Sequence, residues 1–184
     1  MNIAIILSGG VGSRMGLDIP KQYVVVNGQP IISYCIQTFL CNEHTDAIVI
    51  GVANGWKEYV MEQMEKLHGE TRQYSIFNAL RVVKDQGYSD DSFVIIHDAA
   101  RPLVSDELIN RCYEACNRAD GSMPVIAVKD TTYYSEDGKS ITSLLDRSKL
   151  WAGQAPEAFV FGKYLQIHEK MSHEELLKIN GSTE

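Results

Sequence analysis

Short, continuous apolar runs alternate along the chain with stretches in which apolar residues recur at helical spacing. The continuous runs are typical of strands buried on both faces of a sheet. They occur at Ile3–Leu7, Ala47–Val52, Phe93–Ile96 and Pro124–Val128. Helical periodicity, in several cases with a Ser, Asn or Asp cap near the start, predicts helices at Pro30–Leu40, Trp56–Leu67, Ser75–Lys84 and Asp106–Ala119. The alternation predicts a doubly wound α/β fold, a mostly parallel twisted sheet with helices on both faces.

One segment interrupts this alternation. Thr131–Ser135 and Ser140–Leu145 have the composition of two strands, and Glu136–Lys139 between them contains Asp-Gly, a strong hairpin signal. A hairpin within a parallel fold predicts a projecting β-arm over about residues 130–150. Exposed strand edges are normally paired or covered. We therefore expect a partner subunit at the arm, and the alternative is a β-meander lying on its own domain.

Composition narrows the class of protein. The 184 residues are 45% apolar and 22% charged, which fits one globular domain over residues 1–184. Seventeen Lys and Arg against 24 Asp and Glu give a net charge of −7, which argues against a general nucleic-acid or anionic-membrane binder. Any anionic ligand must therefore be held by local cations. The N-terminal apolar run is too short to span a bilayer and has no basic leader, so we expect a cytoplasmic protein.

A glycine-rich turn, Ser8–Gly16, directly follows the first predicted strand. Glycines let backbone amides approach a phosphate closely. A dinucleotide-binding fingerprint would need a glycine where Met15 stands, and the Gly-Lys-Ser/Thr of a Walker loop is absent. The turn instead contains Arg14, and Pro20–Tyr23 downstream contains Lys21. Two cations separated by a short loop can converge on one polyphosphate, so the sequence predicts a polyphosphate site here.

A second motif, His97–Pro102, closes the apolar run Phe93–Ile96. It puts the Asp98 carboxylate at the carboxyl end of a strand, where ligands bind in sheets of this kind. A carboxylate in this position suits Mg²⁺, which prefers one or two carboxylates together with substrate phosphates. A helix cap is the alternative role for Asp98. For Arg101, binding of an anion and pairing with Asp98 both stay open.

Two further clusters, Gly69–Ser75 and Asp146–Pro156, complete a series of motifs. In chain order these are Gly-Gly-x-Gly-x-Arg-Met, Pro-Lys-Gln-Tyr, Thr-Arg-Gln-x-Ser, His-Asp-Ala-Ala-Arg-Pro, Val-Lys-Asp-Thr and Gln-Ala-Pro-Glu-Ala-Phe. The series spans nearly the whole chain and resembles the CTP-dependent cytidylyltransferases of polyol phosphates. Members of that family act on 2-C-methyl-D-erythritol 4-phosphate in isoprenoid synthesis or on ribitol 5-phosphate in wall-polymer synthesis. The resemblance implies a Rossmann-like nucleotidyltransferase fold.

The resemblance also implies roles for individual residues. Residues implied to bind CTP are Ser8, Gly9, Gly10, Gly12, Gly69, Glu70, Arg72 and Ser75. Those implied in catalysis are Arg14, Lys21 and Arg147, and those implied in substrate binding are Asp98, Arg101, Arg147 and Ala155, with Asp98 also holding Mg²⁺. In this family the arm reaches over a second subunit. A homodimer through the arm is therefore implied, in which Arg147 serves the polyol-phosphate pocket of its neighbour.

This sequence departs from the family pattern in two ways. Ala155 stands where close relatives have threonine, which loosens the choice of polyol. Relatives also continue beyond the position of Glu184, so the C-terminal part of the family fold is expected to be absent from this chain.

Two histidines near the end of the sequence invite comparison with a zinc-binding helix. His168 and His173 are five residues apart, which predicts a solvated helix rather than a zinc site.

We expect the chain to transfer a cytidylyl group from CTP to 2-C-methyl-D-erythritol 4-phosphate with release of pyrophosphate. Ribitol 5-phosphate or another polyol phosphate is the alternative substrate. A non-catalytic relative that binds nucleotide is the alternative from another class. A nucleotidyltransferase acting on a sugar 1-phosphate and a dehydrogenase are further alternatives.

Overall fold

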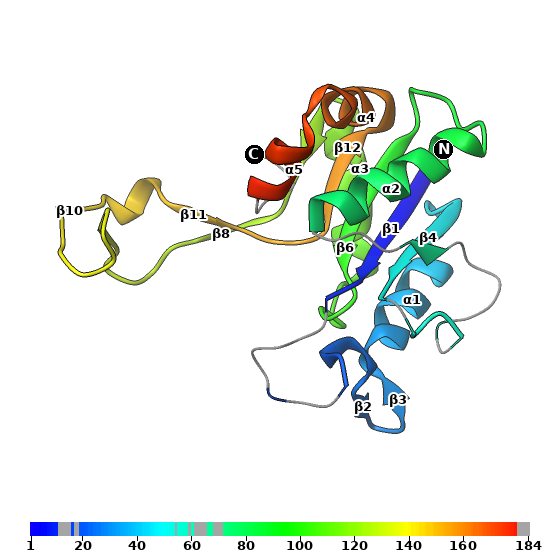
Figure 1. Ribbon diagram of the computed structural model, residues 1–184, viewed down its shortest axis with the longest axis horizontal. Coiled ribbons are helices and arrows are strands. Elements are labelled where there is room, and N and C mark those ends of the chain that lie inside the picture. The colour runs from blue at the N-terminus through cyan, green and yellow to red at the C-terminus, as the bar shows by residue number, and fades with distance from the viewer. Residues whose placement is uncertain are drawn as a thin grey trace.

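The computed structural model describes residues 1–10, 16, 19–53, 55–58, 60, 66–67 and 72–179. Its centre is a six-stranded sheet with the order β5-β4-β1-β6-β12-β7 (Figure 1). The parallel part consists of β1 (Asn2–Ser8), β4 (Ala47–Val52), β5 (Lys66–Leu67) and β6 (Phe93–Asp98). β12 (Glu157–Val160) runs antiparallel to β6, and β7 (Gly121–Ser122) runs antiparallel to β12. The predicted α/β class and the mostly parallel sheet are confirmed.

Helices cover both faces of this sheet, which explains the continuous apolar strands. On one face, α1 (Ile31–Cys41) and α3 (Asp106–Cys116) pack with Ala4 and Ile6 of β1. On the other, α2 (Arg72–Asp85) and α4 (Phe161–Lys170) pack with Ile3 and Ile5. Successive residues of a strand point to opposite faces, so a strand covered on both sides is apolar at every position. No helix in the described ranges combines the length and apolar character needed to cross a membrane.

Local sequence signals fix the smaller elements. The 3₁₀ helix η2 (Lys21–Tyr23) precedes the hairpin of β2 (Val25–Val26) and β3 (Gln29–Pro30). Asn27 (φ 49°) and Gly28 (φ 81°) form its turn, which requires positive φ at both positions. Helix α3 begins after Ser105, whose hydroxyl accepts a hydrogen bond from the Leu108 amide at 3.2 Å. The last helix described, α5 (His173–Lys178), packs beside α2.

A long two-stranded arm extends away from the body of the molecule (Figure 1). Its base is the antiparallel pair β8 (Val125–Ala127) and β11 (Trp151–Gly153). Its outer part is the pair β9 (Tyr133–Tyr134) and β10 (Ser143–Leu144), and the 3₁₀ helix η3 (Arg147–Lys149) lies between β10 and β11. The arm is longer than the sequence predicted, because its strand pairing begins at Val125.

The turn at the tip of the arm is closed by one side chain. The Asp137 carboxylate accepts hydrogen bonds from the backbone amides of Ser140 (2.7 Å) and Lys139 (2.8 Å). These bonds favour the ionised carboxylate and lower the pKa of Asp137 to about 2. Gly138 adopts φ 68°, which a residue with a side chain rarely does. The Asp-Gly hairpin signal in the sequence therefore marks the tip correctly.

Three local predictions are wrong. Pro124–Val128 is not a buried strand, since Val125 and Ile126 of the arm are 45% and 57% exposed. The predicted helix Trp56–Leu67 is wrong at its C-terminal end, because residues 66–67 form the edge strand β5. Within the predicted helix, residues 59 and 61–65 lie outside the described ones. His168 is buried instead of solvated: its ring stacks on Phe77, and Nδ1–H donates to the Tyr164 carbonyl at 2.9 Å.

Candidate active site

The first part of the site lies at the carboxyl end of β1, where two buried side chains hold the start of the glycine-rich turn. The Gln22 Nε2 amide donates hydrogen bonds to the carbonyl oxygens of Ser8 (2.8 Å) and Gly10 (2.9 Å). The Ser8 hydroxyl donates to the Tyr23 hydroxyl oxygen at 2.8 Å. Gln22 is 2% exposed and Tyr23 is 1% exposed. Together they fix η2 against the end of β1.

This anchoring determines where Lys21 lies. It is the exposed first residue of η2, directly before the buried Gln22 and Tyr23. The Tyr23 ring also stacks on Trp56, with ring centroids 4.5 Å apart. The ammonium group of Lys21 is therefore attached to a backbone segment that the buried side chains of Gln22 and Tyr23 hold in place. Gly12 and Arg14, predicted to act with it, lie outside the described residues.

We expect Gln22→Glu to damage this anchor selectively. The substitution keeps the shape of the side chain but replaces the donating amide by a carboxylate that faces two carbonyl oxygens. A buried polar group without a partner costs about 1–3 kcal/mol, so the free energy of unfolding should fall by that amount, and the KM for the nucleotide expected at this turn should rise. Denaturant unfolding and steady-state kinetics measure the two effects. The control is Gln37→Glu on an exposed position of α1; equal effects of both variants would contradict the anchor.

The second part of the site lies one strand away, at the end of β6. Leu7 pairs with Asp98 in the β1–β6 register, and the Ala99 amide donates to the Leu7 carbonyl at 3.0 Å. Asp98 is thus adjacent to the residue that precedes the glycine-rich turn. It does not cap a described helix, since α3 is capped by Ser105. This excludes the alternative role for Asp98 within the described part of the chain.

Arg101 links this carboxylate to the segment that returns from the arm. Its Nε donates to Asp98 Oδ2 at 3.1 Å, and its Nη1 donates to Gln154 Oε1 at 3.3 Å. Of the two roles open for Arg101, pairing with Asp98 is therefore present in the structure. A pocket of about 290 Å³ adjoins these groups and is lined by His97, Arg101, Pro102, Leu103, Val104, Leu108 and Ala155. Arg101 and Ala155, predicted from separate motifs, both line this pocket, and Asp98 is paired with Arg101 beside it.

The donor chemistry at Asp98 fits a magnesium ion that takes most of its ligands from a substrate. Within the described ranges, no group of three or more His, Cys, Asp or Glu residues gathers as a metal cage. Mg²⁺ characteristically keeps waters and binds through one or two carboxylates plus phosphate oxygens. A single carboxylate beside the glycine-rich turn, which the sequence predicts to bind phosphate, meets that requirement, provided that a nucleotide supplies the other ligands.

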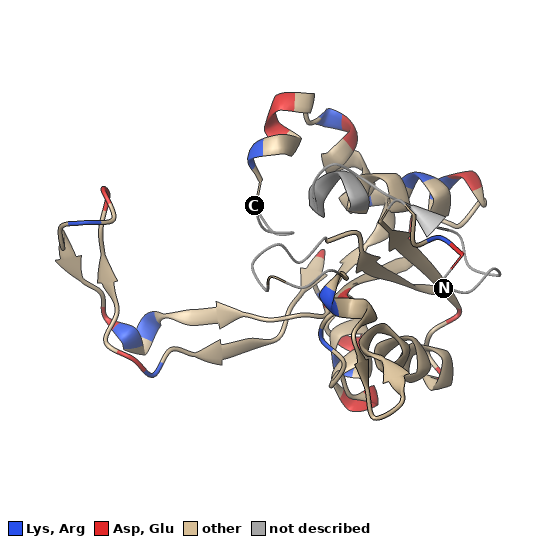
Figure 2. Cartoon of the chain, turned by 60° about the horizontal axis from the view of Figure 1, so that its bottom comes forward, with Lys and Arg blue, Asp and Glu red and all other residues tan. Residues whose placement is uncertain are grey.

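The remaining predicted residues are spread over other elements. Arg72 is the first residue of α2 and Ser75 lies in its first turn, whereas Gly69 and Glu70 lie outside the described residues. Arg147 is in η3 on the arm, where its Nη1 donates to the Lys129 carbonyl at 2.8 Å. The arm carries the basic residues of η3 away from the body (Figure 2). The chain by itself thus leaves Arg147 apart from Asp98 and Lys21.

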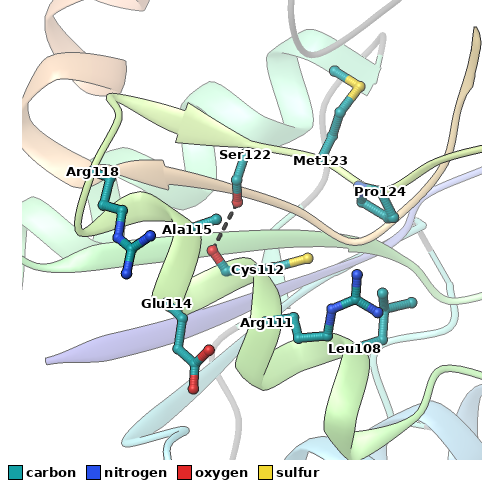
Figure 3. A pocket seen from close by; sticks show the side chains of 9 residues that line it. All are labelled: Leu108, Arg111, Cys112, Glu114, Ala115, Arg118, Ser122, Met123 and Pro124. Carbon is teal, nitrogen blue, oxygen red and sulfur yellow. Dashed lines mark hydrogen bonds between the residues drawn. The ribbon is translucent and has the colours of Figure 1, made fainter.

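A larger pocket lies elsewhere and is not this site. It has a volume of about 540 Å³ and lies between α3 and the segment that leads from β7 towards β8 (Figure 3). Its lining residues are Leu108, Arg111, Cys112, Glu114, Ala115, Arg118, Ser122, Met123 and Pro124. None of the residues predicted to bind nucleotide or substrate is among them. The pairing of β1 with β6 therefore locates the site better than pocket size does.

Three residues of the site were given no role by the sequence: Gln22, Tyr23 and Gln154. Gln22 and Tyr23 contact the glycine-rich turn across 12 to 15 residues, and Gln154 contacts Arg101 across 53. Only a weak signal was available. A large polar residue and an aromatic residue directly follow a predicted ligand-binding lysine in Pro20–Tyr23, and such neighbours are suited to anchoring a short turn.

Solved structures with this fold define the class of protein. A 2-C-methyl-D-erythritol 4-phosphate cytidylyltransferase from Francisella tularensis superposes with a TM-score of 0.81 and 27% identity, covering 98% of this chain and 82% of that one. A 4-diphosphocytidyl-2C-methyl-D-erythritol synthase superposes with a TM-score of 0.77 and 25% identity, over 95% and 82% of the two chains. The fold shared with these structures, together with the candidate site at the ends of β1 and β6, makes the chain an α/β nucleotidyltransferase.

Sequence comparison identifies the family. The profile of the 2-C-methyl-D-erythritol 4-phosphate cytidylyltransferases matches residues 2–180. The enzyme of that name from Lachnospira eligens is 36% identical, over 86% of this chain and 72% of its own. A ribitol-5-phosphate cytidylyltransferase from Streptococcus agalactiae is 33% identical, over 91% and 74%. The chain belongs to the 2-C-methyl-D-erythritol 4-phosphate cytidylyltransferase family, whose members use CTP and a sugar or polyol phosphate.

Proposed function

We propose that this cytidylyltransferase acts on 2-C-methyl-D-erythritol 4-phosphate, forming its 4-diphosphocytidyl derivative and pyrophosphate for isoprenoid precursor synthesis. The observation that carries the proposal is the pairing of Leu7 with Asp98, which sets the glycine-rich turn beside the Asp98–Arg101 pair. The triphosphate binds at the turn and the polyol phosphate binds at the pair. The two reacting phosphates therefore meet between the ends of two adjacent strands.

The chemistry requires charge neutralisation and alignment more than proton transfer. An oxygen of the polyol phosphate attacks the α-phosphorus of CTP in line, the bond to the β-phosphate oxygen breaks, and pyrophosphate leaves from the opposite side. Two anions must approach each other, so preorganised cations stabilise the transition state most. Lys21 and Arg14 supply positive charge at the α-phosphate, and Arg101 orients the polyol phosphate. When bound, Mg²⁺ at Asp98 neutralises further phosphate charge.

The pocket beside Arg101 favours a branched, methyl-bearing polyol. Most of its lining is apolar, contributed by Pro102, Leu103, Val104, Leu108 and Ala155. A methyl branch gains from contact with such a surface, whereas the hydroxyls of a linear polyol would lose hydrogen bonds to water there. Ala155 adds no hydroxyl to replace them.

The arm supports the proposal of a homodimer. A two-stranded ribbon is marginally stable alone in water, yet this one exposes several large apolar side chains. These are Val125, Ile126, Tyr133, Tyr134, Ile141, Leu144 and Trp151. A second copy of the chain covers them in the dimer. Each arm then brings its Arg147 to the polyol-phosphate pocket of the other subunit.

Pyrophosphate release tests the substrate assignment. The chain is incubated with CTP and Mg²⁺, and with either 2-C-methyl-D-erythritol 4-phosphate or ribitol 5-phosphate. One methyl group in an apolar pocket discriminates by about 10- to 200-fold, so kcat/KM should be at least about tenfold higher for the branched substrate. Ala155→Thr restores a hydroxyl and should shift the ratio towards ribitol 5-phosphate. Faster turnover of ribitol 5-phosphate by the unmodified chain would contradict the assignment, and CTP binding without turnover of either would indicate a non-catalytic relative.

A further inference from the structure

The buried imidazole of His97 is tied to the proposed substrate site in a way that the catalytic roles above do not use. His97 is the penultimate residue of β6 and is 1% exposed. Its Nε2 lies 3.0 Å from the carbonyl oxygen of Arg101. Because a carbonyl oxygen only accepts, Nε2 carries the proton and donates it. The ring also packs against Phe39 of α1, with ring centroids 5.5 Å apart.

This hydrogen bond closes the turn that presents Asp98 and Arg101. The Arg101 amide also donates to the Asp98 carbonyl at 2.9 Å, so the backbone of Arg101 is held at both its amide and its carbonyl. Its side chain folds back to the Asp98 carboxylate, with side-chain exposures of 49% for Arg101 and 33% for Asp98. Ion pairs as exposed as this contribute little to holding a geometry. The buried His97 bond is the stronger constraint on where the two charged groups point.

The bond to the Arg101 carbonyl is the single hydrogen bond of this ring within the described part of the chain. Among the described residues, Nδ1 of His97 is buried without a hydrogen-bond partner. Leaving a buried acceptor unpaired is costly, so an apolar side chain would suit this part of the core better. The ring also lines the pocket shared with Arg101 and Ala155. The bond to Arg101 is therefore the interaction that distinguishes a histidine from a phenylalanine here.

We propose that His97 is a positioning residue for cytidylyl transfer: through the Arg101 carbonyl it fixes the turn Asp98–Arg101 so that the carboxylate and the guanidinium meet the polyol phosphate in one arrangement. The inference rests on the proposed function. His97 touches no reacting atom. It acts directly on the turn Asp98–Arg101 at the end of β6 and not on the glycine-rich turn at the end of β1.

Three substitutions and one control test this. His97→Phe keeps a ring and removes the donor, His97→Gln retains an amide donor near the position of Nε2, and His97→Asn is too short to reach the Arg101 carbonyl. His168→Phe is the control, because His168 is also buried and also donates to a backbone carbonyl, but in α4. Losing a partner that orients a ligand-binding group typically costs 10- to 100-fold, so His97→Phe and His97→Asn should raise the KM for the polyol phosphate by about that factor. The KM for CTP should rise less, because only a Mg²⁺ at Asp98 connects this turn to the nucleotide, and His97→Gln should restore most of the loss.

Amide hydrogen exchange at Arg101 gives a second readout that needs no turnover. Exchange should accelerate in His97→Phe and His97→Asn and remain slow in His97→Gln and His168→Phe. If His97→Phe does not fold, the Gln and Asn variants provide the same comparison. The positioning role would be overturned if His97→Gln and His97→Asn had equal kinetics and equal exchange at Arg101. It would also be overturned if the loss of activity across the variants followed their thermal stability alone. If the Arg101 amide is protected from exchange in the unmodified chain but that chain turns over no substrate, the result counts against the proposed function and not against the positioning role.

Discussion

Replacing Lys21 by alanine is expected to lower the rate of pyrophosphate release at least about a hundredfold, the typical effect of removing one preorganised group that stabilises transition-state charge. The reason is structural as well as electrostatic. Lys21 is an exposed residue on a 3₁₀ turn whose next two residues are buried and hydrogen bonded to Ser8 and Gly10. Its charge is therefore available at the phosphates without a large cost of ordering the backbone. Steady-state kinetics with saturating CTP measures the loss.

Two controls make the Lys21 result specific. Lys170→Ala removes an equally exposed lysine from α4 and should leave the rate unchanged. Lys21→Arg keeps the charge but changes its shape, and it should retain part of the activity because the guanidinium also neutralises phosphate. Thermal unfolding checks that all three variants fold. Near-normal turnover by Lys21→Ala would remove Lys21 from the catalytic machinery.

Mixing two inactive variants is expected to restore activity. Arg147→Ala should be nearly inactive, because in the proposed dimer the arm then brings no guanidinium to the neighbouring site, and Lys21→Ala should be nearly inactive for the reason above. In a mixed dimer, one site combines the intact Lys21 of one chain with the intact Arg147 of the other. Half of the dimers are mixed after random exchange and each has one good site, so about a quarter of the unmodified activity should return.

The recovery depends on Lys21 and Arg147 acting from different chains. Two variants that damage the same half of the site, such as Lys21→Ala and Gln22→Glu, should show no activity beyond that of Gln22→Glu itself when mixed. Light scattering should give twice the mass of one chain for each variant. If mass measurements show mixed dimers but no activity returns, Arg147 acts in its own subunit or in none. A monomer in solution would remove the basis for the dimer.

The sheet could be predicted from sequence because its strands are covered on both faces. The run Ala47–Val52 coincides with β4, and Ile3–Leu7 lies within β1. The same criterion failed for Pro124–Val128, because an apolar run does not show that the strand lies inside the body of the molecule, and Val125 and Ile126 stand exposed on the arm. His168 was misassigned for a related reason. A histidine whose Nδ1–H bonds the carbonyl four residues earlier loses much of the cost of burial, and no spacing of polar residues reveals that bond.

The candidate site was predictable where it depends on short motifs and not where it depends on contacts between them. Asp98 and Arg101 belong to one motif, and their pairing was among the expected arrangements. The anchoring of the glycine-rich turn by Gln22 was not predictable, because its partners are backbone carbonyls, and any residue type supplies these. The positions of Arg14 and Glu70 lie outside the described residues and stay predictions.

The chain contains two tryptophans, and they lie in different parts of the molecule. Trp56 stacks on Tyr23, whose hydroxyl bonds Ser8 at the start of the glycine-rich turn. Trp151 is 60% exposed at the base of the arm. Indole emission depends on contact with water and with neighbouring rings. The molecule thus carries one intrinsic fluorophore beside the glycine-rich turn, where nucleotide is proposed to bind, and another on the arm, so single-tryptophan variants can report on the two regions independently.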